Sequence, residues 1–177
     1  METTRLIIRT FTASDADDLY AYLSREPVVR YEPYPPLTRA QAEEEVLRRA
    51  GDPNFYAVVL KENGRVIGNL YFAPGEFETW ELGYVFHDAY WGRGYADEAC
   101  RVLLKDAFAS GKVRRVIAMC NPENAASWRL LERLGMRREG HLRQNIWFFR
   151  DSEGQPIWQD TYEYGILREE FLNTDEA

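Results

Sequence analysis

The sequence predicts a single mixed α/β domain in which helices cover a central mixed sheet. Strand-like and helix-like segments alternate in the middle of the chain, while strands dominate both ends. The 177 residues fit one domain, 1–177, and contain no internal repeat or linker. Hydrophobic residues make up 45% and charged residues 29%, so the chain can form a globular core without disulfides or metals.

The N-terminal part is predicted from strand patterns and helix-start signals. Residues 5–9 predict an edge-like strand, and residues 12–14 supply N-cap candidates for a helix over residues 15–24. Three prolines within residues 31–36 predict a rigid irregular segment. Thr38 then begins a polar helix that extends to about residue 50.

The middle of the chain predicts a hairpin, a further strand and the strongest helix. The β-rich runs 55–61 and 66–72 flank Asn63-Gly64, the strongest short signal for a hairpin turn. Another strand is expected over residues 80–86. The helix spans residues 96–110, because its apolar side chains recur at i, i+3, i+4 and i+7 and form one buried face.

The C-terminal part predicts a second amphipathic helix and further strands. Leu130, Leu131 and Leu134 form the apolar face of this helix, and Gly135 ends it. Strands are expected over residues 113–120, 145–149 and 158–167, with a turn at 151–154.

Charge and hydropathy exclude several classes of partner. The net charge of −7 repels phosphate backbones, so no direct nucleic-acid partner is expected, whereas it suits a cationic amine. No apolar run approaches the roughly 20 residues of a membrane helix, and the N-terminus lacks the apolar stretch of a secretory signal. We therefore expect a cytoplasmic monomer or homodimer with no membrane partner.

The cysteines argue against a metal site. Cys100 and Cys120 are the only two, and no CxxC or Cys/His cluster supplies metal ligands. We expect both thiols to be free and buried.

The most informative motif runs from Tyr90 to Ala96, between a strand and the strongest helix. Gly92 and Gly94 allow the backbone to approach a ligand closely. The start of a helix leaves four N–H groups without partners and is the positive end of the helix dipole. A pyrophosphate accepts hydrogen bonds from these N–H groups, and its negative charge is stabilised by the dipole. A tight turn without a ligand is the alternative. The missing Gly-Lys-Ser/Thr excludes a Walker loop, and GxGxA is not a dinucleotide fingerprint.

A second polar motif precedes the second amphipathic helix. Asn121 is expected as the N-cap, with Pro122 at the first helical position. Ser127 lies on the side of the apolar stripe, so its hydroxyl requires a partner. Bonding to a carbonyl one turn earlier is the alternative role.

Together these motifs resemble the GNAT superfamily of N-acetyltransferases. Gly94 and Ala96 match its cofactor loop, Gln/Arg-x-x-Gly-x-Gly/Ala, whereas Trp91 stands where Gln or Arg is usual. The RimJ/RimL-like branch of ribosomal-protein N-acetyltransferases is the more similar one. The segments that carry this resemblance are residues 91–96, 4–9, 121–127 and 160–164. The resemblance covers nearly the whole chain, and it implies a mostly antiparallel sheet with splayed middle strands and helices on both faces.

The resemblance also implies acetyl-CoA as the cofactor. The pantetheine arm would lie between the diverging strands, paired to backbone almost as an added strand. The implied cofactor-binding residues are Val85, Phe86, Trp91, Gly92, Arg93, Gly94, Tyr95, Ala96, Asn121 and Asn124. The side chain of Arg93 is either a phosphate ligand or a solvated loop charge.

For catalysis, the resemblance implies that Ser127 stabilises the departing thiolate. Many family members carry a tyrosine for this task further along the helix, where this chain has Leu131. Glu81 is the first candidate for the base that deprotonates the amine, and Glu163 is the second. An exposed strand carboxylate without such a role is the alternative for Glu81.

Histidine and cysteine offer weaker candidates. Histidine is a common general base, but no spacing places His87 or His141 beside a nucleophile. An acyl-cysteine route through Cys120 is the alternative to direct attack in a ternary complex.

The predicted function is acetyl transfer from acetyl-CoA to a primary amine, with a protein N-terminal α-amine as the first acceptor. The alternatives are a small amine (amino acid, polyamine or aminoglycoside) and a non-catalytic acyl-CoA-binding module. Aromatic side chains either line an acceptor pocket or belong to the core. They are Tyr31, Tyr34, Trp80, Tyr84, Trp147, Phe148 and Trp158.

Overall fold

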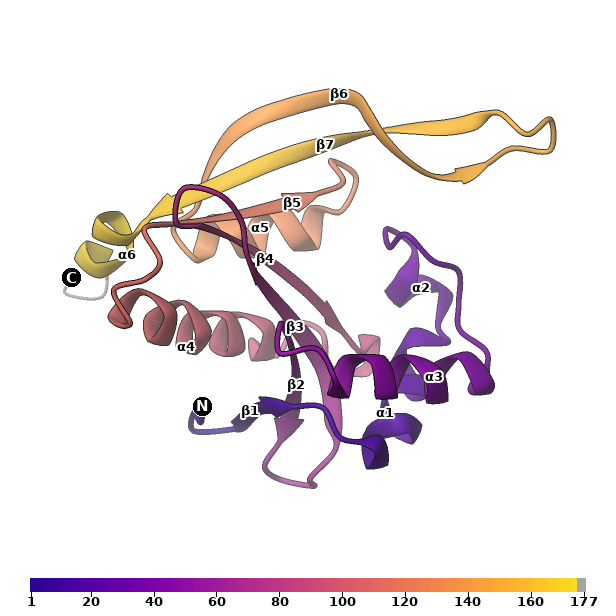
Figure 1. Cartoon of the computed structure of the whole chain (residues 1–177), viewed down its shortest axis with the longest axis horizontal. Coiled ribbons are helices and arrows are strands. Elements are labelled where there is room, and N and C mark those ends of the chain that lie inside the picture. Colours follow the sequence, from indigo (N-terminus) through magenta and orange to yellow (C-terminus); the bar gives the residue numbers. More distant parts are fainter. Residues whose placement is uncertain (175–177) are drawn as a thin grey trace.

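The computed structural model describes residues 1–174 and contains a seven-stranded sheet (Figure 1). The strands are β1 (Leu6–Thr10), β2 (Phe55–Leu60), β3 (Val66–Pro74), β4 (Thr79–Phe86), β5 (Arg115–Cys120), β6 (Arg137–Arg150) and β7 (Pro156–Leu167). Their order in the sheet is β1-β2-β3-β4-β5-β7-β6. Neighbouring strands are antiparallel except β4 and β5, which confirms the mixed, mostly antiparallel sheet.

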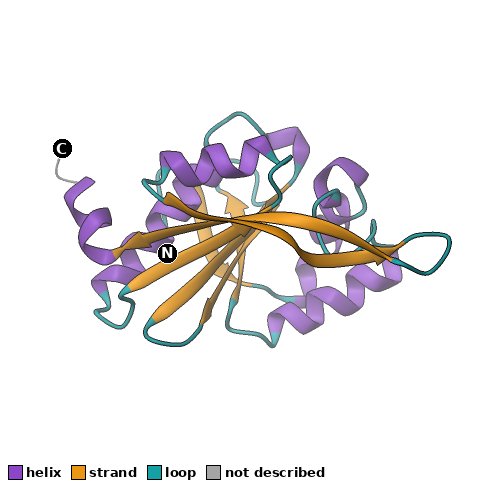
Figure 2. Ribbon diagram, turned by 90° about the horizontal axis from the view of Figure 1, so that it is seen from above, coloured by secondary structure: helices purple, strands orange, loops and turns teal. Residues whose placement is uncertain are grey.

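Helices cover both faces of the sheet (Figure 2). They are α1 (Ala16–Leu23), α2 (Glu26–Val29), α3 (Arg39–Ala50), α4 (Tyr95–Ala109), α5 (Ala125–Arg133) and α6 (Arg168–Thr174). Successive residues of a strand point to opposite faces. Accordingly, Ala57 and Val59 of β2 pack with α1 to α3, whereas Val58 and Leu60 pack with α4 to α6. No helix within residues 1–174 is both long and apolar enough to cross a bilayer.

The sheet opens between its two parallel strands. Pairing of β4 with β5 begins at Thr79 and Arg115 and reaches only to Glu81 and Ile117. Beyond this point β4 continues its pairing with β3, and β5 continues with β7. The predicted splay of the middle strands is therefore confirmed.

The C-terminal hairpin is longer than the sequence predicted. Strand β6 extends from Arg137 to Arg150 rather than over residues 145–149, and the β6–β7 hairpin projects from the body of the molecule (Figure 1). As an edge strand, β6 is largely exposed and lacks the apolar alternation that marks a half-buried strand. Its pairing with β7 also shifts register three times. The short helices α2 and α6 were not predicted either.

The start of α5 differs from the prediction. The N-cap is Asn124, whose Oδ1 accepts a hydrogen bond of 3.2 Å from the Ser127 N–H, so the assignment of Asn121 as N-cap was wrong. Asn121 instead holds the preceding turn, because its Oδ1 accepts a bond of 2.9 Å from the Glu123 N–H. Pro122 consequently lies before the helix.

Candidate active site

Two adjoining pockets lie around the opening in the sheet. The first, here termed the loop pocket, has a volume of about 920 Å³ and is bounded by α2, the end of β4, α5 and residues 90–97, of which Arg93 alone does not line it. The second, the cleft pocket, has a volume of about 1070 Å³ and is bounded by residues 31–37, by α3 and by strands β3 to β7. Six residues line both pockets and form what we call the junction: Tyr31, Glu32, Tyr84, Val85, Asn124 and Ser127.

The loop pocket presents backbone donors. Gly94 is the N-cap of α4 with a φ of 78°, a left-handed conformation that favours glycine, and it has no side chain to cap the helix. The first N–H groups of α4, at Tyr95 and Ala96 in the pocket wall, therefore lack intrahelical partners. Arg133 also lines this pocket. Arg133 lies 3.9 Å from Asp97 in the same wall, so the backbone donors are the feature that fits two phosphates of a nucleotide cofactor.

Two side chains hold residues 91–96, the predicted phosphate loop, in place. The Trp91 indole Nε1 donates to the Phe86 carbonyl at 2.8 Å, which ties the loop to the end of β4. Arg5 donates to the Arg93 carbonyl at 2.9 Å, and it forms an ion pair with Glu98 at 2.6 Å. The tryptophan that replaces the usual glutamine or arginine thus has a structural role in this chain.

The backbone of β4 faces the opening at alternate residues. The His87 N–H donates to the Ile67 carbonyl of the neighbouring chain segment at 2.9 Å. Since backbone groups alternate sides along a strand, Val85 also faces β3, whereas Tyr84 and Phe86 face the opening. The Cβ position of Gly68 lies only 2.6 Å from the Val85 carbonyl oxygen, in agreement with this assignment. Of the two predicted backbone partners for pantetheine, only Phe86 faces the opening.

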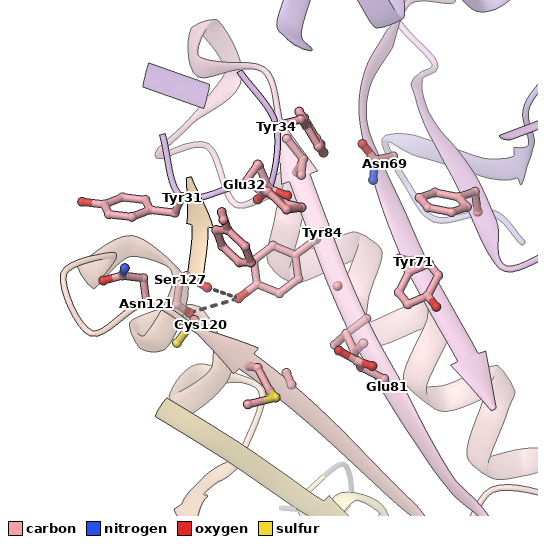
Figure 3. Close-up of a pocket in the computed structure, with 18 of the residues that line it drawn as sticks. Tyr31, Glu32, Tyr34, Asn69, Tyr71, Glu81, Tyr84, Cys120, Asn121 and Ser127 are labelled. Atoms are coloured by element: carbon pink, nitrogen blue, oxygen red, sulfur yellow. Dashed lines mark hydrogen bonds between the residues drawn. The ribbon is translucent and has the colours of Figure 1, made fainter. Parts of the chain in front are cut away.

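The junction brings two hydroxyl groups together. The Ser127 Oγ lies 2.9 Å from the Tyr84 hydroxyl, which also donates to the Ser127 carbonyl at 3.1 Å (Figure 3). Burial raises the pKa of Tyr84 well above its usual value, so this phenol stays protonated. Burial likewise raises the pKa of the nearby Cys120 thiol to about 11, although the Ser127 hydroxyl acts in the opposite sense.

A carboxylate that the sequence did not indicate completes the junction. Glu32 extends from the irregular segment toward Tyr84 (Figure 3). Burial raises its pKa from 4.5 to about 7, while Arg49 and a hydrogen bond from Tyr34 act in the opposite sense. A carboxylate with this pKa is half ionised at neutral pH. Nothing in the local sequence marks Glu32, because its burial arises from the packing of α3 and β4 against this segment.

The other predicted bases lie outside the junction. Glu81 lines only the cleft pocket. It lies nearer the start of β4 than Tyr84 does, on the side of Tyr71 (Figure 3). Glu163 lines neither pocket and forms an ion pair with Arg115 at 3.7 Å. His87 accepts from the Ala89 N–H at 3.1 Å. His141 lies 2.7 Å from Asp160 in the C-terminal hairpin.

The other residues predicted to bind the cofactor do not all lie at the junction. Asn124 lies at the junction, with its Oδ1 engaged in the helix cap. Asn121 lines only the cleft pocket, where its Nδ2 donates to Gln159 at 3.1 Å. Arg93 is exposed, and its guanidinium lies 5.8 Å from the centre of the Tyr90 ring. Cys100 and Cys120 are both free and buried, as predicted.

Comparisons with known proteins agree with this geometry. The model of the acetyltransferase (GNAT) domain matches residues 5–137. The uncharacterised N-acetyltransferase YnaD of Bacillus subtilis is 37% identical over 96% of this chain and 97% of its own length. A GNAT-family acetyltransferase from Bacillus anthracis is 35% identical, with a TM-score of 0.87 over 96% of this chain and 99% of that chain.

A more distant structure shares the fold. Spermidine N-acetyltransferase from Vibrio cholerae, solved in complex with CoA and spermine, is 19% identical with a TM-score of 0.78. The alignment covers 97% of this chain and 100% of that chain. On the family match and the relatives that span almost its whole length, the chain belongs to the GNAT family of acetyltransferases, enzymes that use acetyl-CoA.

Proposed function

We propose that the chain transfers the acetyl group of acetyl-CoA to a primary amine by direct attack at the junction. The observation that carries this proposal is the meeting of two pockets at one set of polar side chains. The loop pocket suits a cofactor diphosphate, and the cleft pocket is left for the acceptor. Acetyl-CoA supplies an activated acetyl group, which transfers to nitrogen as the carbon–sulfur bond breaks.

Glu32 is the base in this proposal. An alkylammonium group must lose a proton before its nitrogen can attack, and a carboxylate with a pKa near the working pH accepts that proton efficiently. Glu32 has such a pKa and lines both pockets. Glu81 is the alternative base, since it lines the cleft pocket from β4.

Ser127 and Tyr84 stabilise the negative charge that develops on the departing sulfur. Both hydroxyls lie at the junction, and their mutual contact fixes their orientation. Tyr84 reaches this place from β4, so its phenol provides the donor that family members carry on the helix at the position of Leu131. Asn124 orients Ser127 by capping the helix on which it lies.

Direct attack is favoured over an acyl-cysteine route. The only thiol in the cleft pocket wall is that of Cys120, within the described residues, and burial holds it protonated at neutral pH. Initial rates measured against both substrates test this point. Intersecting reciprocal plots are expected, whereas parallel plots would indicate a covalent enzyme intermediate.

Two acceptor classes follow from the sequence. The resemblance to the RimJ/RimL-like branch supports a protein N-terminal α-amine, and the family more broadly supports small amines. A thiol-release assay with acetyl-CoA and a panel of peptides and small amines tests the function. Release that depends on an amine is expected. Binding of coenzyme A without release from any acceptor would identify a non-catalytic acyl-CoA-binding module instead.

A further inference from the structure

The cleft pocket contains a buried cation with an unused donor. The side chain of Arg49, on α3, is 2% exposed and lines the cleft pocket. Its Nη1 has no hydrogen-bond partner among residues 1–174. Buried polar atoms are nearly always paired, so an unpaired guanidinium nitrogen in a pocket wall requires an explanation.

The neighbours of Arg49 satisfy only part of the hydrogen-bonding capacity of its guanidinium. Its Nε donates to Glu45 at 2.7 Å, its Cζ lies 4.8 Å from the centre of the Phe55 ring, and a hydrogen bond joins the guanidinium to Tyr34. The adjacent Arg48 shares the first two of these partners, at 2.7 Å from Glu45 and 4.8 Å from the ring, yet its side chain is 52% exposed. Arg48 alone can therefore form the ion pair with Glu45. A structural role of that pair does not explain why the guanidinium of Arg49 is buried as well.

The charges around Arg49 suit a zwitterionic ligand. Glu45 is divided between Arg48 and Arg49, and Asp52 lies 3.8 Å from Arg48. These four ionised groups carry no net charge together. The carboxyl of Glu32 is a further acidic group that interacts with Arg49. A zwitterionic ligand adds no net charge to this set: its ammonium group suits Glu32, and its carboxylate meets the fork of N–H donors that arginine provides.

Resting on the proposed function, we propose that the acceptor is a small amino carboxylic acid whose carboxylate binds Arg49 while its amine lies at the junction. Arg49 lines only the cleft pocket, so the loop pocket and its cofactor do not account for the unpaired nitrogen. Glu32 and Arg49 line the same pocket, where Glu32 faces the amine and Arg49 the acid. Arg49 is thus a specificity-determining residue.

The experiment measures kcat/KM for matched acceptors by thiol release from acetyl-CoA. The acids are glycine, L-alanine, β-alanine and 4-aminobutanoate, which vary the spacing between amine and carboxylate. Each is compared with its amide, which keeps the amine and removes the charge. Spermidine and a short peptide represent the competing acceptor classes. The best acid is expected to exceed its amide by about 10- to 100-fold, the range of a charge-assisted hydrogen bond.

Two matched variants assign the preference to one arginine. Arg49→Met should reduce the acid-to-amide ratio to about 1, whereas Arg48→Met removes the neighbouring guanidinium and should keep the ratio. A ratio is insensitive to partial unfolding, because inactive protein affects both acceptors equally. If Arg49→Met does not fold, Arg49→Lys, which lacks the planar fork, should still lower the ratio.

The outcomes separate this inference from the proposed function. Turnover of amides, spermidine or the peptide at rates equal to or above those of every acid would overturn the inference and leave acetyl transfer intact. The same holds if Arg49→Met keeps the preference. An absence of thiol release with all acceptors would contradict the proposed function itself, and the inference with it.

Discussion

At the scale of single residues, the proposed chemistry depends on where burial places three polar side chains. Glu32, Tyr84 and Ser127 come from an irregular segment, a strand and a helix, and they meet where the two pockets join. The place of Ser127 followed from its spacing along an amphipathic helix, and its role from the family resemblance. The place of Glu32 did not, because a glutamate within a proline-rich segment has no periodicity that reveals its surroundings.

Replacement of Glu32 tests the assignment of the base. With a pKa of about 7, Glu32 is half ionised at that pH and mostly ionised above it, so kcat/KM for the acceptor should rise with pH through about 7. Glu32→Gln should remove this limb and lower kcat/KM by about 10²- to 10⁴-fold, the usual contribution of a positioned base. Glu81→Gln is the control and should retain the limb. If only Glu81→Gln abolishes the rise of kcat/KM with pH, Glu81 is the base.

The same carboxylate has a measurable effect on stability. Its pKa is higher in the folded chain than the ordinary 4.5, so the folded state binds more protons and stability falls as pH rises from about 4.5 through 7. Glu32→Gln avoids this loss and should be more stable than the parent at pH 8, by at most about 3 kcal/mol. At pH 4 to 5 the two should be nearly equal. Urea unfolding at both pH values gives the comparison, and an unchanged difference would place Glu32 in solvent.

The two hydroxyls at the junction predict a specific kinetic pattern. Ser127→Ala and Tyr84→Phe each remove one donor from the place where negative charge develops, so kcat should fall by about 10- to 1000-fold. Coenzyme A affinity, measured by calorimetry, should change little, because neither hydroxyl lies in the phosphate loop. A double variant no slower than either single variant would show that they act as one unit. Unaltered kcat in both single variants would exclude this role.

At the scale of elements, the phosphate loop depends on contacts far away in sequence. Arg5, from the segment before β1, binds the Arg93 carbonyl and pairs with Glu98 in the first turn of α4. The N-terminal segment 4–9, which resembles the family, therefore also positions the phosphate loop.

Truncation of Arg5 should loosen this loop. Arg5→Ala is expected to raise KM for acetyl-CoA several-fold with a smaller change in kcat, because the backbone donors of the loop lose an anchor. Arg93→Ala, which removes an exposed side chain and keeps the carbonyl that Arg5 binds, should raise KM less. The comparison of KM for acetyl-CoA in the two variants tests this role of Arg5. A larger increase in Arg93→Ala would instead identify the Arg93 guanidinium as the phosphate ligand.

The strongly amphipathic helices were predictable, whereas most of the exposed edge strand was not. Helix α4 buries the stripe that includes Leu103 and Leu104, so its periodicity was plain in the sequence. Strand β6 lies at the edge with little buried surface, and only part of it was predicted. The cap of α5 was assigned three residues too early, because Asn121 and Asn124 are both good N-cap residues and only the fold selects between them.

At the scale of the whole molecule, the opening of the sheet creates the site. Three residue pairs join β4 to β5, and beyond them each strand follows its other neighbour. In the proposed function, the space between the strands lets a cofactor from one side and an acceptor from the other reach the same hydroxyls. The resemblance predicted this opening, whereas the unpaired nitrogen of Arg49 became apparent only from the packing.

The most direct test of this account is a crystal structure of the chain with coenzyme A and an acetylated amine. The diphosphate is expected against the backbone of residues 92–96, with the sulfur within hydrogen-bond distance of Ser127 or Tyr84 and the amide nitrogen beside Glu32. A cofactor bound elsewhere, or a sulfur remote from the junction, would contradict the central claim that the two pockets meet at the point of transfer.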